Sequence, residues 1–206
     1  MNNLSNEVDR LKSRYREIFL KTSEEFIAKT EKMSVQEFDA FLKEDVSKEI
    51  CEKRLEIFEL RKKFNCIGCA ACCNLAVSQF SPEELNQKAK EGDNFAKQFI
   101  NTFIPYKNEE DANKIYPEYF KLLKTKAQDE KVYFYHCPKV TVYNLCPDYE
   151  NRPQICKDFP DNPLGFLPKT CGFCEWKEKI EETALKVSAL FEIVEFYKSK
   201  LKVMEN

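Results

Sequence analysis

The sequence is poor in glycine and in long apolar runs, and each shortage excludes a class of protein. With only four glycines in 206 residues, it cannot form a glycine-rich phosphate loop or a dinucleotide-binding fingerprint, which argues against most nucleotide-binding enzymes. No apolar segment approaches the roughly 20 residues that a membrane-spanning helix needs. No secretory signal is visible either, because the N-terminus is the polar stretch MNNLSNEVDRLKSRYREIF. We therefore expect a cytoplasmic protein that does not enter membranes.

A strong charge of either sign is also lacking. The 33 basic and 35 acidic residues leave a net charge of −2, which gives no electrostatic reason to bind nucleic acid or an anionic membrane. Charged residues make up 33% of the chain and hydrophobic residues 43%, as in a soluble globular protein with charged helix surfaces. The length suits one domain, or one domain with an extension.

Cysteine, in contrast, is abundant, with ten in the chain. In a chain without a secretory signal this favours metal or redox chemistry over a disulfide framework, because the cytosol keeps thiols reduced. Nine of the cysteines fall into two groups. The first is the run CIGCAACC, with Cys66, Cys69, Cys72 and Cys73, and the second comprises Cys137, Cys146, Cys156, Cys171 and Cys174.

Both ends of the chain have the apolar periodicity of amphipathic helices. Apolar residues recur at three- and four-residue steps over 4–18 and again over 35–64. Ser34 and Glu37 have the spacing of a capping box, which predicts that the second helix starts there. The segment after Cys174 has a similar apolar face. We expect an N-terminal helical hairpin against which the last helix packs, although the first stripe could instead be a partner-binding coiled coil.

The middle of the chain mixes helices with irregular backbone. Ser81 and Pro82 are typical of a helix start, and we expect that helix to run to Phe103. Another helical stretch is expected over 109–128, disturbed by Pro117. The stretch KVYFYHCP at 131–138 alternates like a strand, and VTVY at 140–143 is its candidate hairpin partner. The proline-rich segment from Cys146 to Cys171 is expected to be irregular, with little capacity to bury apolar surface by itself.

These patterns predict a mainly α protein. The N- and C-terminal helices should form a helical bundle around a small irregular cysteine-rich metal-binding region with at most one β-hairpin. Three domains follow from this division: an N-terminal helical hairpin extension at 1–65, a cysteine-cluster metal-binding domain at 66–175, and a C-terminal helix at 176–206 that packs on the N-terminal helices.

The cysteine spacing itself suggests a metal site. Thiolates in C-x2-C can share an ion on one tight loop, and zinc takes such pairs into a tetrahedral site. The pattern C-x2-C-x2-C is similar to the run that wraps an iron–sulfur cluster, and Cys137 and Cys146 each precede a proline, as does one ferredoxin ligand. Because the sequence has only one histidine, the donor inventory favours an iron–sulfur cluster over zinc. Thiol or disulfide chemistry without metal is the third interpretation.

The number of thiols exceeds the needs of one four-ligand site. The cysteines could supply two four-ligand sites, one site with redox-active thiols, or one site with a disulfide. The adjacent Cys72 and Cys73 cannot easily serve one ion, because successive side chains diverge, so one of them should face the main site. Cys51 lies at helical spacing far from other cysteines, and we expect it to pack in the core.

Three further residues near the cysteines have two interpretations each. Cys174 makes a C-x2-C pair with Cys171 but also opens the last helix, so its role as a ligand stays open. His136 precedes a cysteine, yet a surface or hydrogen-bonded histidine is the simpler interpretation. Arg152 could donate hydrogen bonds to thiolate sulfurs near Cys156, or form a surface ion pair.

The run from Cys66 to Cys73, followed by YENRPQICKDFP at 149–160, resembles the cysteine-cluster proteins called the CxxCxxCC family. That family is described as zinc- or iron-chelating, its members are often labelled iron–sulfur proteins, and the similarity covers about 66–174. Cys51 and Cys174 depart from its pattern. The metal ligands that the resemblance implies are Cys66, Cys69, Cys72, Cys73, Cys146 and Cys156, together with Cys137 and Cys171, whose flanks are less distinctive.

We therefore expect a metal-binding protein with an iron–sulfur cluster, used in electron transfer, redox sensing or metal handling. The first alternative is a structural zinc module that presents its terminal helices to a protein partner. The second is a methylase-like enzyme, since a related cysteine module occurs in flagellin lysine N-methylase. The sequence shows no separate constellation of catalytic residues, so we predict none.

Overall fold

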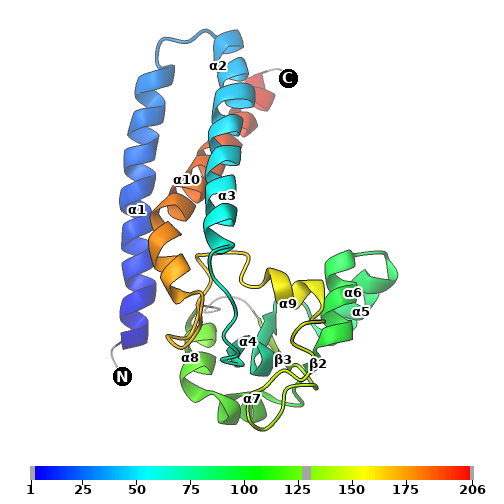
Figure 1. Cartoon of the computed structure of the whole chain (residues 1–206). Coiled ribbons are helices and arrows are strands. Elements are labelled where there is room, and N and C mark those ends of the chain that lie inside the picture. The colour runs from blue at the N-terminus through cyan, green and yellow to red at the C-terminus, as the bar shows by residue number, and fades with distance from the viewer. Residues whose placement is uncertain (1–2, 127–130, 205–206) are drawn as a thin grey trace. The chain divides into compact units, whose positions relative to one another are not determined.

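The computed structural model describes residues 3–126 and 131–204. It is 64% helix and 5% strand, so the predicted mainly α fold is confirmed. The chain forms two compact units, which are described separately: a helical unit of Met1–Phe64 with Glu175–Asn206, and a cysteine unit of Asn65–Cys174 (Figure 1). The three predicted domains stay a prediction about how the chain folds.

The helical unit contains the N-terminal helices and nearly all of the last helix. The capping box predicted at Ser34 is present, because the Ser34 hydroxyl accepts from the Glu37 backbone N–H while the Glu37 carboxylate accepts from that of Ser34. After the Ser34 turn the chain returns beside the first helix (Figure 1). The elements are α1 (Asn3–Thr30), α2 (Val35–Phe41), the π-helical turn η1 (Leu42–Val46), α3 (Ser47–Arg61) and α10 (Cys174–Met204).

An aromatic and aliphatic core joins these helices. Phe26 of α1 stacks on Tyr197 of α10 with ring centroids 5.2 Å apart, and Trp176 is fully buried, with its Nε1–H donating to the Ile57 carbonyl at 3.1 Å. The expected packing of the last helix on the N-terminal helices is thus seen in side-chain contacts. The buried cluster is Phe26, Leu42, Val46, Ile50, Val187, Leu190, Ile193 and Val194.

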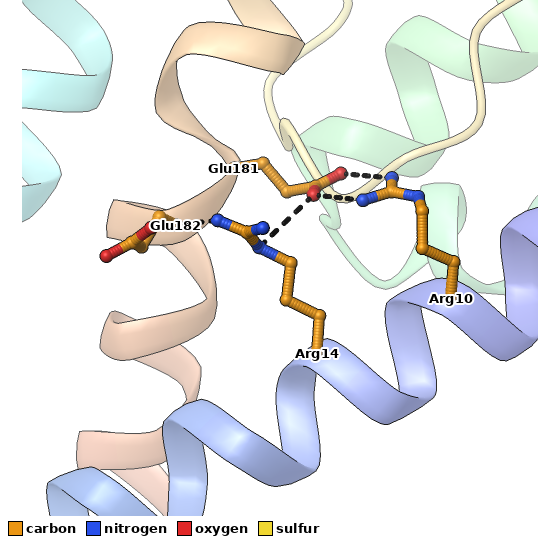
Figure 2. A network of polar contacts seen from close by, with 4 residues as sticks. All are labelled: Arg10, Arg14, Glu181 and Glu182. Atoms are coloured by element: carbon orange, nitrogen blue, oxygen red, sulfur yellow. Dashed lines mark hydrogen bonds and ion pairs between the residues drawn. The ribbon is translucent and has the colours of Figure 1, made fainter.

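A buried carboxylate adds a polar contact between α1 and α10. Glu181 accepts two hydrogen bonds from the Arg10 guanidinium, at 2.7 and 2.8 Å (Figure 2). Arg14, one turn further along α1, approaches Glu181 at 3.8 Å and donates to the exposed Glu182 at 2.8 Å. The hydrogen bond from Arg10 lowers the pKa of Glu181, so the carboxylate stays charged despite its burial.

The expectation that Cys51 packs in the core is wrong, because its side chain is exposed. The buried positions on this part of the helix are Val46 and Ile50. Adjacent helical residues are turned by about 100°, so the residue after Ile50 leaves the buried face. Cys51 is therefore exposed because it lies one residue beyond the buried Ile50.

The cysteine unit holds a three-stranded antiparallel sheet of order β1-β3-β2. The central strand β3 pairs with β1 in the register Val77↔Phe134, and with β2 in the register Ile104↔His136. The elements are α4 (Ala71–Asn74), β1 (Ala76–Ser78), α5 (Pro82–Lys90), α6 (Asn94–Thr102), β2 (Ile104–Pro105), α7 (Glu109–Ile115), α8 (Pro117–Lys126), β3 (Tyr133–His136) and α9 (Gln154–Asp158).

The strand expected within 131–138 is present as β3, but its predicted hairpin with 140–143 is wrong. Residues 141–145 form a turn instead, in which the Asn144 N–H donates to the Thr141 carbonyl at 2.9 Å. Val142 and Tyr143 are 92% and 80% exposed. Pro138 has no N–H to contribute to a ladder, and β3 already has partners on both edges from earlier in the chain.

The helix predicted over 81–103 is divided in two, whereas the stretch predicted over 109–128 is interrupted at Pro117 as expected. The first starts as expected at a capping box between Ser81 and Glu84, but it stops before Gly92, whose φ is +105°. Asp93 then caps α6 by accepting from the Ala96 N–H. Pro117 begins α8 in the second region, and the predicted end of that helix lies outside the described residues.

Packing between α6, β3 and α9 fixes the frame of the cysteine unit. Phe99 meets Tyr135 edge to face at 4.9 Å, and Ile155 of α9 packs against the same cluster. The Gln98 side chain accepts from the Ile155 N–H at 3.0 Å. Separately, among the helices in the described part of the chain, none combines the length and the apolar character needed to cross a membrane.

Candidate metal centre

A cavity of about 820 Å³ within the cysteine unit brings the expected ligands together. Cys51 and Cys174 do not line it, and neither does His136. The cysteines on its wall are Cys66, Cys69, Cys72, Cys73, Cys137, Cys146, Cys156 and Cys171.

The CIGCAACC run lies along this wall because its backbone turns sharply twice. Gly68 and Ala70 have φ values of +74° and +57°, so a left-handed residue stands on each side of Cys69. The short helix α4 follows at once, and its Asn74 N–H donates to the Ala70 carbonyl at 2.8 Å. The Gly68 N–H donates to the Cys66 sulfur at 3.5 Å, which ties this thiol to the turn.

Strand β3 carries Cys137 to the cavity. The Cys137 N–H donates to the Cys73 carbonyl at 2.7 Å, just beyond the pairing of β1 with β3. The chain then makes the exposed turn at 141–145 and returns to Cys146. An ion pair between Lys139 and Asp148 at 3.2 Å closes the base of this loop, so the two cysteines that flank it stay near one another.

Tyr149 and Arg152 hold the segment before α9, which carries Cys156. The Tyr149 hydroxyl donates to the Cys66 carbonyl at 2.5 Å. The Arg152 Nε donates to the Tyr149 carbonyl at 2.8 Å, and its guanidinium lies 3.7 Å from the centroid of the Tyr149 ring. Arg152 also exerts an attractive charge on Cys73 and Cys156, while its hydrogen bonding to thiolate sulfur stays a prediction.

Cys171 reaches the cavity through a tight contact between two segments. A Cβ on Gly172 would lie 2.4 Å from the Asn65 carbonyl oxygen and 2.9 Å from Ile67, so only glycine fits between them. The Cys171 N–H donates to the Pro168 carbonyl at 2.8 Å. The Cys174 thiol donates to that same carbonyl at 3.0 Å, a contact that directs it away from a ligand role.

Hydrogen bonds between thiols shift several pKa values. The bond between Cys69 and Cys171 lowers the pKa of Cys69 to about 6 and raises that of Cys171, because one thiol donates and the other accepts as a thiolate. The bond between Cys72 and Cys73 likewise raises the pKa of Cys72 and lowers that of Cys73. Burial raises the pKa of Cys156 to about 11.

The thiols meet in pairs rather than around one point. Within residues 3–126 and 131–204, no group of three or more His, Cys, Asp or Glu side chains is gathered closely enough to hold a metal ion. The donor set nevertheless fits a thiophilic metal, since eight thiols face one cavity. A cysteine side chain turns about a single χ1 bond, so a change of rotamer can bring its sulfur inward without moving the backbone.

Sequence reasoning missed two residues that shape this cavity. Tyr119 lines it and is buried, and its hydroxyl donates to the Phe166 carbonyl at 3.2 Å. Nothing in its helical context distinguishes it from a core aromatic residue. Gly172 could have been noticed, because a glycine between two cysteines in a glycine-poor sequence indicates close backbone approach.

Eight thiols that line one cavity, on loops and on the short helices α4 and α9, define a cysteine-rich chelating module. The model of the CxxCxxCC family, described as "Putative zinc- or iron-chelating domain", matches residues 65–186. The chain belongs to this family, which confirms the resemblance seen in the cysteine run and supports metal binding without distinguishing the two metals. No curated protein and no solved structure matches the chain.

Proposed function

We propose that the cavity binds an iron–sulfur cluster and that the protein works in electron transfer, redox sensing or metal handling. The observation that carries this proposal is the composition of the wall: eight cysteines line it, while the single histidine of the sequence does not. Iron–sulfur clusters are held chiefly by cysteine thiolates, whereas many zinc sites include histidine.

The rest of the wall suits a redox centre. Aromatic and aliphatic residues line the cavity together with the cysteines, including Phe99, Phe103 and Phe166. Such an apolar shell limits access of water, and N–H groups near sulfur, such as that of Gly68, tune the reduction potential of a cluster. The family description is compatible with this choice because it includes iron.

Two alternatives are each favoured by one observation. A structural zinc module is favoured by the all-thiol set, since sites made of four cysteines commonly hold zinc, and the terminal helices would then present a surface to a protein partner. A methylase-like enzyme is favoured by the cavity volume of about 820 Å³, which lies within the range of small-molecule sites.

Anaerobic purification of the full chain, followed by metal and acid-labile sulfide analysis, decides between the iron–sulfur and the zinc function. Iron with matching sulfide and a brown colour is the result we expect. Colourless protein with stoichiometric zinc would replace the cluster by a structural zinc site. Protein that takes up neither zinc nor iron with sulfide would remove metal binding from the function altogether.

A further inference from the structure

We propose that the eight thiols form two adjacent four-thiol metal sites rather than one larger site. This inference rests on the proposed metal binding, but it holds for zinc as well as for iron–sulfur clusters. The Cys171 set consists of Cys66, Cys69, Cys72 and Cys171, and the Cys156 set consists of Cys73, Cys137, Cys146 and Cys156.

The short helix α4 supplies one thiol to each set. Cys72 and Cys73 are consecutive in this helix, so their Cα–Cβ bonds are turned from one another by about 100°. Their thiols share a hydrogen bond, as expected for two residues that stand where neighbouring sites adjoin. The charges that act on Cys72, besides that of its neighbour, come from Cys66 and Cys69. Cys73 instead lies near Arg152. Cys69 also acts on Cys73, as expected for neighbouring sites.

The Cys171 set is brought together by the close approach of Gly172 to the backbone at Asn65. Because only glycine fits at position 172, the segment that carries Cys171 lies directly against Asn65 and Ile67. Cys66 begins the cysteine run on this same stretch. The thiols of Cys69 and Cys171 already share a hydrogen bond. The C-x2-C turn of the cysteine run thus faces the turn that carries Cys171, and thiolates from two such turns can surround a tetrahedral ion.

The Cys156 set is brought together by the sheet and the loop that follows it. The backbone bond from Cys137 to Cys73 at 2.7 Å places these two residues side by side. The ion pair of Lys139 with Asp148 closes the loop that leads to Cys146. Cys156 completes the set: it lies in α9 and lines the same cavity, and, besides burial, the thiols that raise its pKa are Cys73, Cys137 and Cys146.

Arg152 distinguishes the two sets electrostatically. Its charge acts on Cys73 and Cys156, both of which belong to the Cys156 set. Four thiolates around a divalent ion leave a charge of about −2, and a nearby guanidinium offsets part of it. We therefore expect Arg152→Gln to weaken metal retention at the Cys156 set while leaving the Cys171 set loaded.

Zinc titrated into the reduced full chain tests this division by stoichiometry. We expect about two zinc ions per chain, since each ion takes four thiols. Cys69→Ser and Cys171→Ser should each retain about one ion, and the double variant should also retain about one, because both residues serve the same site. Cys69→Ser combined with Cys156→Ser should retain none. Cys174→Ser and Cys51→Ala are the matched controls and should retain both.

Several outcomes would overturn the division. A single zinc per full chain, loss of both ions from the Cys69/Cys171 double variant, or loss from Cys174→Ser would each do so. If a serine variant does not fold, alkylation of the unmodified chain at substoichiometric zinc replaces it: thiols of one set should be protected together. Protection spread evenly over all eight refutes two sites. A chain with two zinc ions that never takes up iron with sulfide removes only the iron–sulfur function.

Discussion

The buried carboxylate of Glu181 offers a sharp test of how the helical unit is held together. Two hydrogen bonds from Arg10 bind it, and its side chain is only 9% exposed (Figure 2). Glu181→Ala removes both bonds. The neighbouring Glu182 pairs with Arg14 at a similar distance, but its side chain is 73% exposed, which makes Glu182→Ala the matched control.

The expected magnitudes differ because water screens the two pairs differently. A hydrogen bond to a charged group contributes about 1.5–3 kcal/mol when shielded. The Arg10 side chain is 48% exposed, so one end of the contact is screened and the contribution falls. We expect Glu181→Ala to lower the free energy of unfolding by about 1–2 kcal/mol, and Glu182→Ala to lower it by at most about 0.5 kcal/mol.

Urea unfolding followed by tryptophan fluorescence measures the free energy of unfolding of the helical unit in both variants. Trp176 is the single tryptophan of the sequence and is fully buried against the helices, so its emission reports the unfolding of the helical unit. Equal losses in the two variants, or no loss in Glu181→Ala, would show that burial does not strengthen this ion pair. A change in m-value would show instead that the unfolded state had changed.

Four further predictions concern pH and the cysteine unit. Because Arg10 lowers the pKa of Glu181 from its ordinary 4.5, the stabilisation holds above pH 4.5 and is lost as pH falls through the folded pKa, so acid titrations of Glu181→Ala and the unaltered protein should converge. Gly172→Ala, whose Cβ would lie 2.4 Å from a backbone oxygen, should lose metal from the Cys171 set; full metal content would contradict the proposed contact. Cys51→Ala should keep all metal and change stability by less than about 0.5 kcal/mol, as at other exposed positions, measured by metal analysis and urea melts. Chelation should expose residues 137–174 to proteolysis before the terminal helices, and equal cutting of both regions with and without metal would show that the metal does not hold the loops.

Local chemistry made parts of the fold predictable. The helix starts at Ser34 and Ser81 follow from capping boxes that lie within four residues of sequence. Strand pairing did not follow, because β3 pairs with β1 and β2 from much earlier in the chain, and no short-range pattern encodes that choice. The exposure of Cys51 was missed because periodicity over a charged helix does not fix the phase of the buried face to one residue.

The candidate site was predictable in its residue types but not in its partners. The eight cysteines were identified from spacing and from the resemblance to the family, and the structure places all of them on one cavity wall. The contact of Cys69 with Cys171 depends on how a distant segment docks. That docking depends in turn on Gly172, where the absence of a side chain lets two segments approach. The spacing of cysteines along the sequence does not reveal this contact.

The loops that follow β3 bury more apolar surface than their composition suggested, and this changes the part that a metal would take in the fold. Phe166, Leu167 and Phe173 are all buried, and protein groups anchor the segment at Tyr149 and Ile155. These contacts hold the backbone of the cavity wall while the thiols meet only in pairs. Metal binding would then mainly order the cysteine side chains and the exposed turn at 141–145. For this reason metal loss should open the cysteine unit first at that turn, and last at the segment that contains Phe166.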